Sequence, residues 1–185
     1  EEFRKHMAHN GVAVTRMDDI MNYTTKWVNE LQATTATVQA RRQFGWTSED
    51  RESFVLGDKE YFGDKIESNP PSSATKDLFH AFTPKGTLEE WKDMVGFYNR
   101  DGFELHQYIV ATSFGSPLMA LSPIACSGLH LHSSDTGLGK TTAMYVASSV
   151  WGKPRELVID RTDTQNSRML RGEVYQNLPL YIDEM

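Results

Sequence analysis

The spacing of hydrophobic residues predicts one long helix near the N-terminus and a group of short strands after it. From Met17 to about Gln32, hydrophobic side chains recur every three or four residues, which is the period of an amphipathic helix. The segments that follow are rich in β-branched and aromatic residues and are separated by glycine-containing turns, as strands are. We expect strands at 34–42, 51–56 and 60–66, separated by Gly45, Gly57-Asp58 and Gly63-Asp64.

Residues 68–122 have the pattern of a linker followed by helices. The polar sequence at 68–73, Ser-Asn-Pro-Pro-Ser-Ser, favours neither a helix nor a strand and predicts a linker. Thr87 and Glu90 form a capping box, in which each side chain satisfies a backbone N–H group at the start of a helix. The elements expected here are helices at 87–98 and 103–114 and a further turn at 118–121.

Beyond residue 122, strands and helices are predicted to alternate. Short apolar runs are separated by segments of helical spacing, an order typical of a parallel sheet with helices on its faces. Gly152 and Pro154 are the stop signal expected after the first of these helices. The expected order is a strand at 124–132, a helix at 140–151, a strand at 156–160, a helix at 164–175 and a strand at 180–182.

The turn between the first strand and the first helix of this region has the pattern of a phosphate-binding P-loop. A glycine-rich turn that runs into a helix N-terminus presents backbone N–H groups to an anion. Lys140 can reach the β- and γ-phosphates of a nucleotide, and the Thr141 hydroxyl can bind the magnesium ion between them. The pattern G-x-x-x-x-G-K-[ST] has glycine where this chain has Ser134, which is small enough for the same turn. The expected nucleotide-binding residues are Ser134, Asp135, Thr136, Gly137, Leu138, Gly139, Lys140, Thr141 and Thr142.

A pair of carboxylates after the last apolar run would complete this site. Asp183 ends that run, so a buried parallel strand would bring its side chain to the edge of the sheet beside the P-loop. We expect Asp183 to bind magnesium and Glu184 to polarise an attacking water molecule. Together with Lys140 and Thr141, these residues predict a site for ATP and Mg²⁺. The alternative is a glycine-rich turn with an exposed lysine, and an acidic pair that caps another element.

The composition of the chain limits the kinds of partner that it can bind and the cellular compartment in which it is expected. The 19 Lys and Arg residues and 25 Asp and Glu residues give a net charge of −6, which argues against a protein that coats DNA through its overall charge. A motor whose basic residues are confined to a channel remains compatible with this charge. We expect no membrane association, because no apolar run is long enough to cross a bilayer and no secretory signal is present. Cys126 is the only cysteine, which excludes an internal disulfide and favours the reducing cytoplasm.

Three other groups of residues have both a functional and a structural interpretation. His130 and His132 with Cys126 could bind a metal ion, but no further ligand completes a set, and histidines of a strand or core are favoured. A basic stretch could contact nucleic acid, although interspersed acidic residues favour a solvated surface. Aromatic residues could stack on single-stranded DNA, although core packing is favoured. The basic residues are Lys153, Arg155, Arg161, Arg168 and Arg171, and the aromatic residues are Phe44, Trp46, Tyr61 and Phe62.

Several fragments of the sequence resemble a known family. They are Gly45-Trp46, Phe-Val-Leu-Gly at 54–57, Gly86-Thr87 with Trp91, Ser-Pro-Leu at 116–118, Gly-Lys-Thr-Thr at 139–142 and Ala-Ser-Ser-Val-Trp-Gly-Lys-Pro at 147–154. From about Arg41 onward the chain is similar to a phage and mobile-element family of P-loop ATPases, labelled as a domain of unknown function and described as helicase-like. The resemblance implies an ATP-driven motor for phage or plasmid DNA replication in a bacterial host cell. It implies that Lys140 binds phosphate, that Thr141 and Asp183 bind the metal ion, and that Glu184 activates water.

The expected fold is α/β, with a partial P-loop NTPase core preceded by a small α+β region. We expect a helix and a β-rich unit at 1–67, a linker and helical region at 68–122, and the core at 123–185. The Asp-Glu pair resembles that of ATPases with a further strand later in the chain and an arginine finger that comes later still or from a neighbouring subunit. We therefore expect the C-terminal strands of the core to be missing, and the 185 residues alone to bind nucleotide weakly without appreciable hydrolysis.

Three functions stay open at this point. The leading one is the ATP-binding part of a DNA-acting motor, a helicase or helicase-primase component that works as a homo-oligomeric ring. The second is a loader, packaging or defence ATPase without unwinding activity. The third is a non-hydrolysing nucleotide-binding interaction module.

Overall fold

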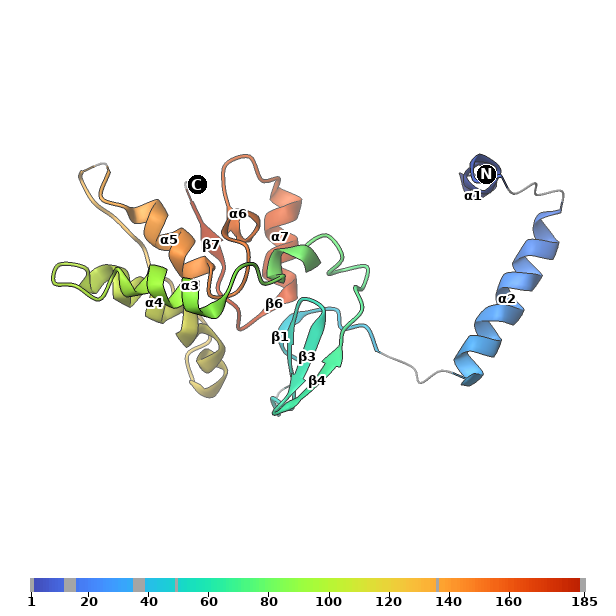
Figure 1. Cartoon of the computed structure of the whole chain (residues 1–185), viewed down its shortest axis with the longest axis horizontal. Coiled ribbons are helices and arrows are strands. Elements are labelled where there is room, and N and C mark those ends of the chain that lie inside the picture. Colours follow the sequence, from blue (N-terminus) through green and yellow to red (C-terminus); the bar gives the residue numbers. More distant parts are fainter. Residues whose placement is uncertain (1, 12–15, 35–38, 49, 136, 184–185) are drawn as a thin grey trace. The chain divides into compact units, whose positions relative to one another are not determined.

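The computed structural model describes residues 2–11, 16–34, 39–48, 50–135 and 137–183 and divides the chain into two compact units (Figure 1). The first unit, residues 1–38, contains the helices α1 (Glu2–His9) and α2 (Met17–Thr34). Helix α2 confirms the helix predicted from the hydrophobic period. None of its residues is buried, and Met21, Trp27 and Leu31 of its apolar stripe are exposed.

The second unit, residues 39–185, has a mixed α/β fold built on a five-stranded sheet of order β4-β3-β2-β1-β6. Strands β1 to β4 form an antiparallel meander, and β6 joins β1 in parallel. Because β6 comes from the region after residue 122, the two ends of this unit share one sheet. The strands are β1 (Phe44–Trp46), β2 (Phe54–Leu56), β3 (Lys59–Phe62), β4 (Lys65–Ser68) and β6 (Tyr175–Gln176).

The meander departs from the predicted strands in three places. Residues 39–42 are not in a strand, and 35–38 lie outside the described residues. The predicted strand at 60–66 is split into β3 and β4, because Gly63 adopts a left-handed φ of 59° and turns the chain. Gly45 was expected to separate strands, but it lies within β1, where it pairs with Val55 and Gln176.

The expected linker at 68–73 is tied to the meander. Ser68 is the last residue of β4, and the Asn69 side chain is only 1% exposed. The Asn69 side-chain amide donates to the Gly57 carbonyl at 2.9 Å, and its side-chain oxygen accepts from the Arg41 backbone N–H at 3.1 Å. Residues 69–72 have no regular secondary structure, as predicted, but an asparagine that satisfies buried backbone groups fixes the segment to the sheet.

A second, parallel pair of strands forms near the end of the chain. Strand β5 (Val158–Ile159) pairs with β7 (Tyr181–Ile182), and helix α7 (Gln165–Val174) lies between them in sequence. The predicted helix at 164–175 and strand at 180–182 are thereby confirmed. The predicted strand at 156–160 is shortened to two residues, because Pro154 starts the short helix α6 (Pro154–Leu157).

The strand predicted at 124–132 does not form. These residues have no regular secondary structure, and no strand in the described part of the chain pairs with them. The side chains of Ile124 and Leu129 are 57% and 46% exposed. Apolar composition alone was an insufficient signal here, since a strand also needs a neighbour that satisfies its backbone groups.

Three helical elements precede this segment, and all three confirm the sequence analysis. Helix α3 (Leu88–Gly96) begins at the predicted capping box, in which the side chains of Thr87 and Glu90 each accept from the other residue's backbone N–H. Helix α4 (Glu104–Gly115) continues into the 3₁₀ helix η2 (Ser116–Leu121). In the described ranges, every helix is too short or too polar to span a bilayer.

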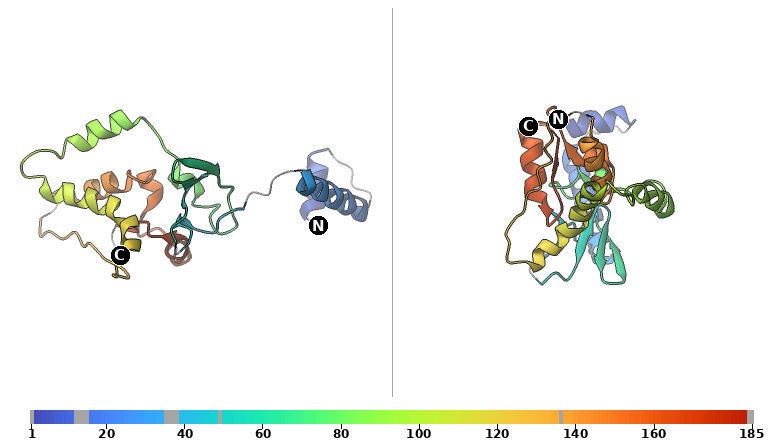
Figure 2. Two further views of the ribbon diagram at one scale, coloured as in Figure 1. Left: turned by 90° about the horizontal axis from the view of Figure 1, so that it is seen from below. Right: turned by 90° about the vertical axis from the view of Figure 1, so that its left-hand side faces the viewer.

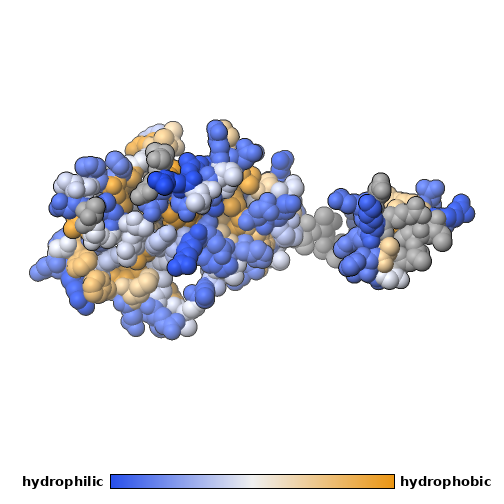
Figure 3. Space-filling view, turned by 90° about the horizontal axis from the view of Figure 1, so that it is seen from above, coloured by the Kyte–Doolittle hydropathy of each residue, from blue (hydrophilic) through white to orange (hydrophobic). Residues whose placement is uncertain are grey.

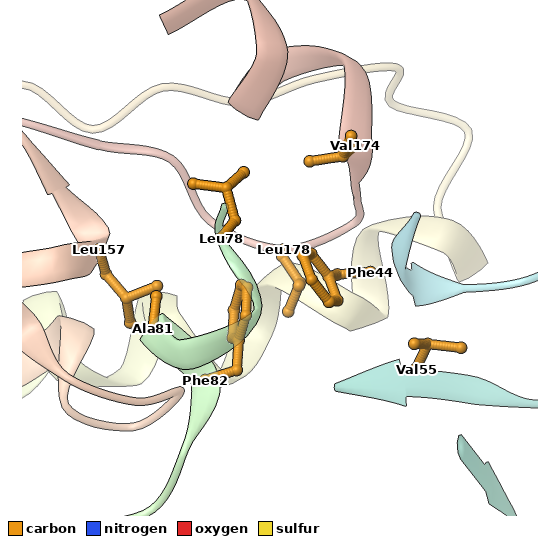
Figure 4. Packing of buried hydrophobic residues seen from close by; sticks show 8 residues of the cluster. All are labelled: Phe44, Val55, Leu78, Ala81, Phe82, Leu157, Val174 and Leu178. Atoms are coloured by element: carbon orange, nitrogen blue, oxygen red, sulfur yellow. The ribbon is translucent and has the colours of Figure 1, made fainter. Parts of the chain in front are cut away.

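The main hydrophobic core joins the meander to the C-terminal region (Figure 4). A central contact is between Phe44 of β1 and Phe82 of the 3₁₀ helix η1 (Phe79–Phe82), whose ring centroids are 4.5 Å apart. The surface contains hydrophilic and hydrophobic areas side by side (Figure 3). The core residues labelled in Figure 4 are Phe44, Val55, Leu78, Ala81, Phe82, Leu157, Val174 and Leu178.

Candidate nucleotide-binding site

The predicted loop leads directly into helix α5 (Lys140–Ser148), whose start confirms the expected helix. Gly137 and Gly139 both have a left-handed φ of 77°, and Gly139 is the N-cap of α5. A side chain at either position would be strained, so the turn requires glycine. The backbone N–H groups of the first helical turn have no carbonyl partner within the helix and carry partial positive charge. The loop therefore leads to backbone N–H groups of the kind that an anion accepts from.

The Lys140 side chain closes across this loop. Its ammonium group donates a hydrogen bond to the Asp135 carbonyl at 3.0 Å, and the Asp135 backbone N–H donates to the Ser133 hydroxyl at 3.1 Å. The charge of Lys140 is thus held across the turn. Thr136 lies outside the described residues, and Ser134 and Thr142 are exposed.

The two predicted magnesium ligands lie next to each other. The Thr141 hydroxyl of α5 is 3.5 Å from a carboxylate oxygen of Asp183. Asp183 directly follows β7, and its backbone N–H donates to the Ile159 carbonyl at 2.8 Å, which continues the pairing of β5 and β7. The parallel strand pair therefore delivers Asp183 to the start of α5, as the sequence analysis expected. Glu184 lies outside the described residues.

Tyr181 ties the strand that carries Asp183 to the helix that carries Thr141. Its hydroxyl donates to the Ala147 carbonyl of α5 at 3.1 Å and makes a short hydrogen bond with the Ser113 hydroxyl of α4. Burial raises the pKa of Tyr181 well above its usual range and outweighs the opposing effect of Ser113. Sequence analysis missed this residue. The available signal was its position two residues before Asp183, because alternate residues of a strand share a face.

Helix α4 lies beside α5 and runs in the same direction (Figures 1 and 2). Near their C-terminal ends, the Ser113 hydroxyl donates to the Ala147 carbonyl at 2.7 Å. Near their N-terminal ends, His106 faces the loop: a Cβ atom added to Gly139 would lie 3.7 Å from the His106 Nε2 atom. The sequence analysis assigned no role to His106, because a single histidine on a helix has no distinguishing pattern.

The histidines and the basic stretch singled out in the sequence do not form a metal-binding cluster or an unpaired basic patch among the residues described. His130 and His132 are exposed, with ring centroids 6.1 Å apart, and no cluster of three or more metal-binding side chains occurs among the residues described. In the basic stretch, Lys153 pairs with Glu156 at 3.2 Å, and the buried Arg171 donates to the Glu156 carbonyl at 2.6 Å.

The aromatic candidates on the meander also have local partners. Phe44 belongs to the core, as the structural interpretation favoured, and the Trp46 indole N–H donates to the Pro117 carbonyl at 2.9 Å. Tyr61 and Phe62 are half-buried on β3.

Comparison with known proteins identifies the family and nothing more specific. The chain has no significant match among curated proteins or among solved structures. The sequence profile of one family, described as Domain of unknown function (DUF927), matches residues 1–185. The chain therefore belongs to the family Domain of unknown function (DUF927).

Proposed function

We propose that this chain contains a P-loop nucleotide site and is the ATP-binding part of a DNA-acting motor ATPase. The observation that carries the proposal is the approach of Thr141 to Asp183. A magnesium-nucleotide site needs a hydroxyl and a carboxylate oxygen side by side, and neighbouring ligands of octahedral magnesium lie about 3 Å apart. The two oxygens are 3.5 Å apart, so a small side-chain movement would bring them to that separation.

The rest of the site suits the phosphates. Lys140 and the N–H groups of the first turn of α5, which have no partner within the helix, supply positive charge on one side of the loop. A phosphate in the loop would replace the Asp135 carbonyl as the acceptor for the Lys140 ammonium group, or share that group with it. The loop is largely exposed, so a polyanion can enter it without displacing core residues.

Thr141 and Asp183 would hold Mg²⁺, which when bound supplies charge neutralisation between the β- and γ-phosphates. Tyr181 holds β7 against α5 and α4 through its hydroxyl, which fixes the distance between the two ligands. We assign the activation of the attacking water to Glu184, because it directly follows Asp183 in the sequence.

The DNA-acting role rests on the resemblance to helicase-like P-loop ATPases, since the family to which the chain belongs is described only as a domain of unknown function. The motor would work as a homo-oligomeric ring, in which another subunit completes hydrolysis. The net charge of −6 is compatible with this role only if basic residues are concentrated on the surface that faces DNA.

Nucleotide binding tests the proposal first. Isothermal titration with ATP and Mg²⁺ should detect binding that Lys140→Ala weakens at least about tenfold, since hydrogen bonds to charged groups contribute roughly 1.5–3 kcal/mol. Lys153→Ala is a matched control, because Lys153 lies beyond the C-terminal end of α5 and pairs with Glu156. Equal affinities for the wild-type chain and Lys140→Ala would contradict a P-loop site.

Activity assays on a protein that contains this chain separate the three functional classes. DNA-stimulated ATP hydrolysis supports a motor and excludes a non-hydrolysing module. Displacement of an annealed strand supports a helicase, whereas hydrolysis without displacement supports a loader, packaging or defence ATPase.

A further inference from the structure

The side chain of His106 is positioned to face the predicted phosphate loop from the neighbouring helix. Helices α4 and α5 run in parallel, so the first turn of α4 lies beside the first turn of α5. A Cβ atom on Gly139 would be 3.7 Å from the His106 Nε2 atom, which is an ordinary van der Waals distance. Gly139 is also the residue at which the loop enters α5. His106 of α4 therefore borders the point at which the loop enters α5.

Two aromatic rings hold the imidazole in this orientation. The ring centroid of His106 is 5.1 Å from that of Tyr98 and 5.1 Å from that of Phe103. Tyr98 and Phe103 are stacked on each other, with centroids 5.7 Å apart, and Tyr98 is buried. The imidazole has little freedom to rotate away, so a contact made by Nε2 would cost little ordering entropy.

The environment of the other ring nitrogen selects a tautomer. The His106 Nδ1 atom is buried and has no hydrogen-bond partner in the described part of the chain. A neutral imidazole has one N–H donor and one bare nitrogen, and burying an unpaired donor costs the desolvation free energy of that donor. Among apolar rings, a nitrogen without a hydrogen costs less free energy to bury than an unpaired N–H group. The surroundings of Nδ1 therefore favour the tautomer with the proton on Nε2, which faces the loop.

We propose that His106 is a further nucleotide-binding residue, whose Nε2–H group donates a hydrogen bond to a phosphate oxygen of the nucleotide in the loop. This inference rests on the proposed nucleotide site and adds a ligand from α4, outside the P-loop motif. The carboxylate of Glu104, the acidic residue nearest in sequence, accepts from the Gly102 backbone N–H at 3.1 Å. Tyr98 and Phe103 act as positioning residues for the imidazole.

Substitutions at position 106 test the contact. His106→Phe keeps an aromatic ring against Tyr98 and Phe103 but removes the donor, and it should weaken ATP binding about tenfold. His106→Gln keeps a donor at similar reach and should recover part of that loss. His80→Phe, on η1, is a matched control that should leave the affinity unchanged. Far-UV circular dichroism and urea unfolding establish that each variant is folded.

Nitrogen NMR of the histidine-labelled chain gives a readout that a structural role would not change. The wild-type chain should show His106 as the Nε2–H tautomer, and saturating ATP should shift its Nε2 resonance but leave that of His80 unchanged. An affinity of His106→Phe equal to that of the wild type, or an unchanged Nε2 resonance at saturation, would overturn the role of His106 alone. Failure of the wild-type chain to bind ATP would overturn this role and the nucleotide site together.

Discussion

The hydroxyl oxygen of Thr141 lies 3.5 Å from a carboxylate oxygen of Asp183, although 42 positions separate the two residues in the sequence. Two features of the fold produce this approach. The pairing of β5 with β7 carries Asp183 to the end of a short parallel sheet, and the hydroxyl of Tyr181 ties β7 to α5. The approach thus depends on backbone pairing and on the hydrogen bonds of one half-buried tyrosine side chain.

Loss of either oxygen ligand should remove the effect of magnesium on nucleotide binding. We expect Asp183→Asn and Thr141→Ala to weaken ATP binding in the presence of Mg²⁺ about tenfold, with little change when EDTA removes the metal. Titration calorimetry under both conditions measures the difference. Asp93→Asn, on an exposed position of α3, is the control. If both variants keep the full magnesium effect, these residues are not the ligands.

Removal of the Tyr181 hydroxyl should destabilise the protein and loosen the site. Tyr181→Phe leaves the Ala147 carbonyl without this donor, and we expect the free energy of unfolding to fall by about 1–2 kcal/mol. Urea unfolding gives the change, and Tyr108→Phe, at an exposed position of α4, should have almost no effect. A stability equal to that of the wild type would show that the hydroxyl does not hold β7 in place.

Stability should fall at acidic pH because a partly buried ion pair joins Arg41 to Glu60 of β3. The Arg41 guanidinium lies 2.7 Å from the Glu60 carboxylate, which also accepts from the Ser53 hydroxyl at 2.5 Å. Burial alone would raise the pKa of Glu60, but the hydrogen bonds from Arg41 and Ser53 outweigh it, and the net pKa is lowered. A lowered pKa stabilises the folded state above the unfolded-state pKa of about 4.3, and this contribution is lost as the pH falls through the folded-state pKa.

A comparison of Glu60→Gln with the wild type at two pH values measures this contribution. We expect the substitution to cost about 2 kcal/mol at pH 7, less than for a fully buried pair because Arg41 is partly exposed. The difference in unfolding free energy should shrink as the pH falls through the lowered folded-state pKa of Glu60. Glu89→Gln, in the first turn of α3, is the control. A difference that is constant from pH 7 to pH 3 would rule out the ion pair as its source.

The parallel contact of β1 with β6 should depend on the absence of a side chain at position 45. A Cβ atom on Gly45 would lie 1.7 Å from the Gln176 carbonyl oxygen, and the residue has a left-handed φ of 93°. We expect Gly45→Ala to cost about 3 kcal/mol or more, since it combines strain with a backbone clash. Gly63→Ala also has positive φ but meets open space, and it should cost about 1–2 kcal/mol. Similar losses for both variants in urea unfolding would contradict the close approach of β6.

The sequence predicted the elements whose signals are local. The capping box of Thr87 and Glu90, the hydrophobic period of α2 and the glycine pattern before Lys140 each depend on residues within a few positions of one another. The structure forms all three elements as expected. The meeting of Thr141 with Asp183 was also expected, because an apolar run that ends in a carboxylate indicates a parallel strand.

The remaining features depend on contacts that the sequence does not encode locally. Ile124 and Leu129 made 124–132 look like a strand, but strand formation needs a neighbouring strand, and these side chains stay exposed. Asn69 made its segment look like a linker, although its polar groups satisfy the buried backbone of the meander. The proximity of His106 to Gly139 follows from the packing of α4 on α5, which no spacing along the chain reveals.

Paramagnetic broadening by Mn²⁺ and ATP tests the central proposal most directly. Manganese replaces magnesium at oxygen sites and broadens NMR signals of nearby nuclei. If the loop binds ATP and magnesium, substoichiometric Mn²⁺ with ATP will broaden the amide signals of Thr141 and Asp183 first. The same addition to Lys140→Ala will not broaden these signals. Broadening confined to other residues, or equal broadening in both proteins, would contradict a nucleotide site at this loop.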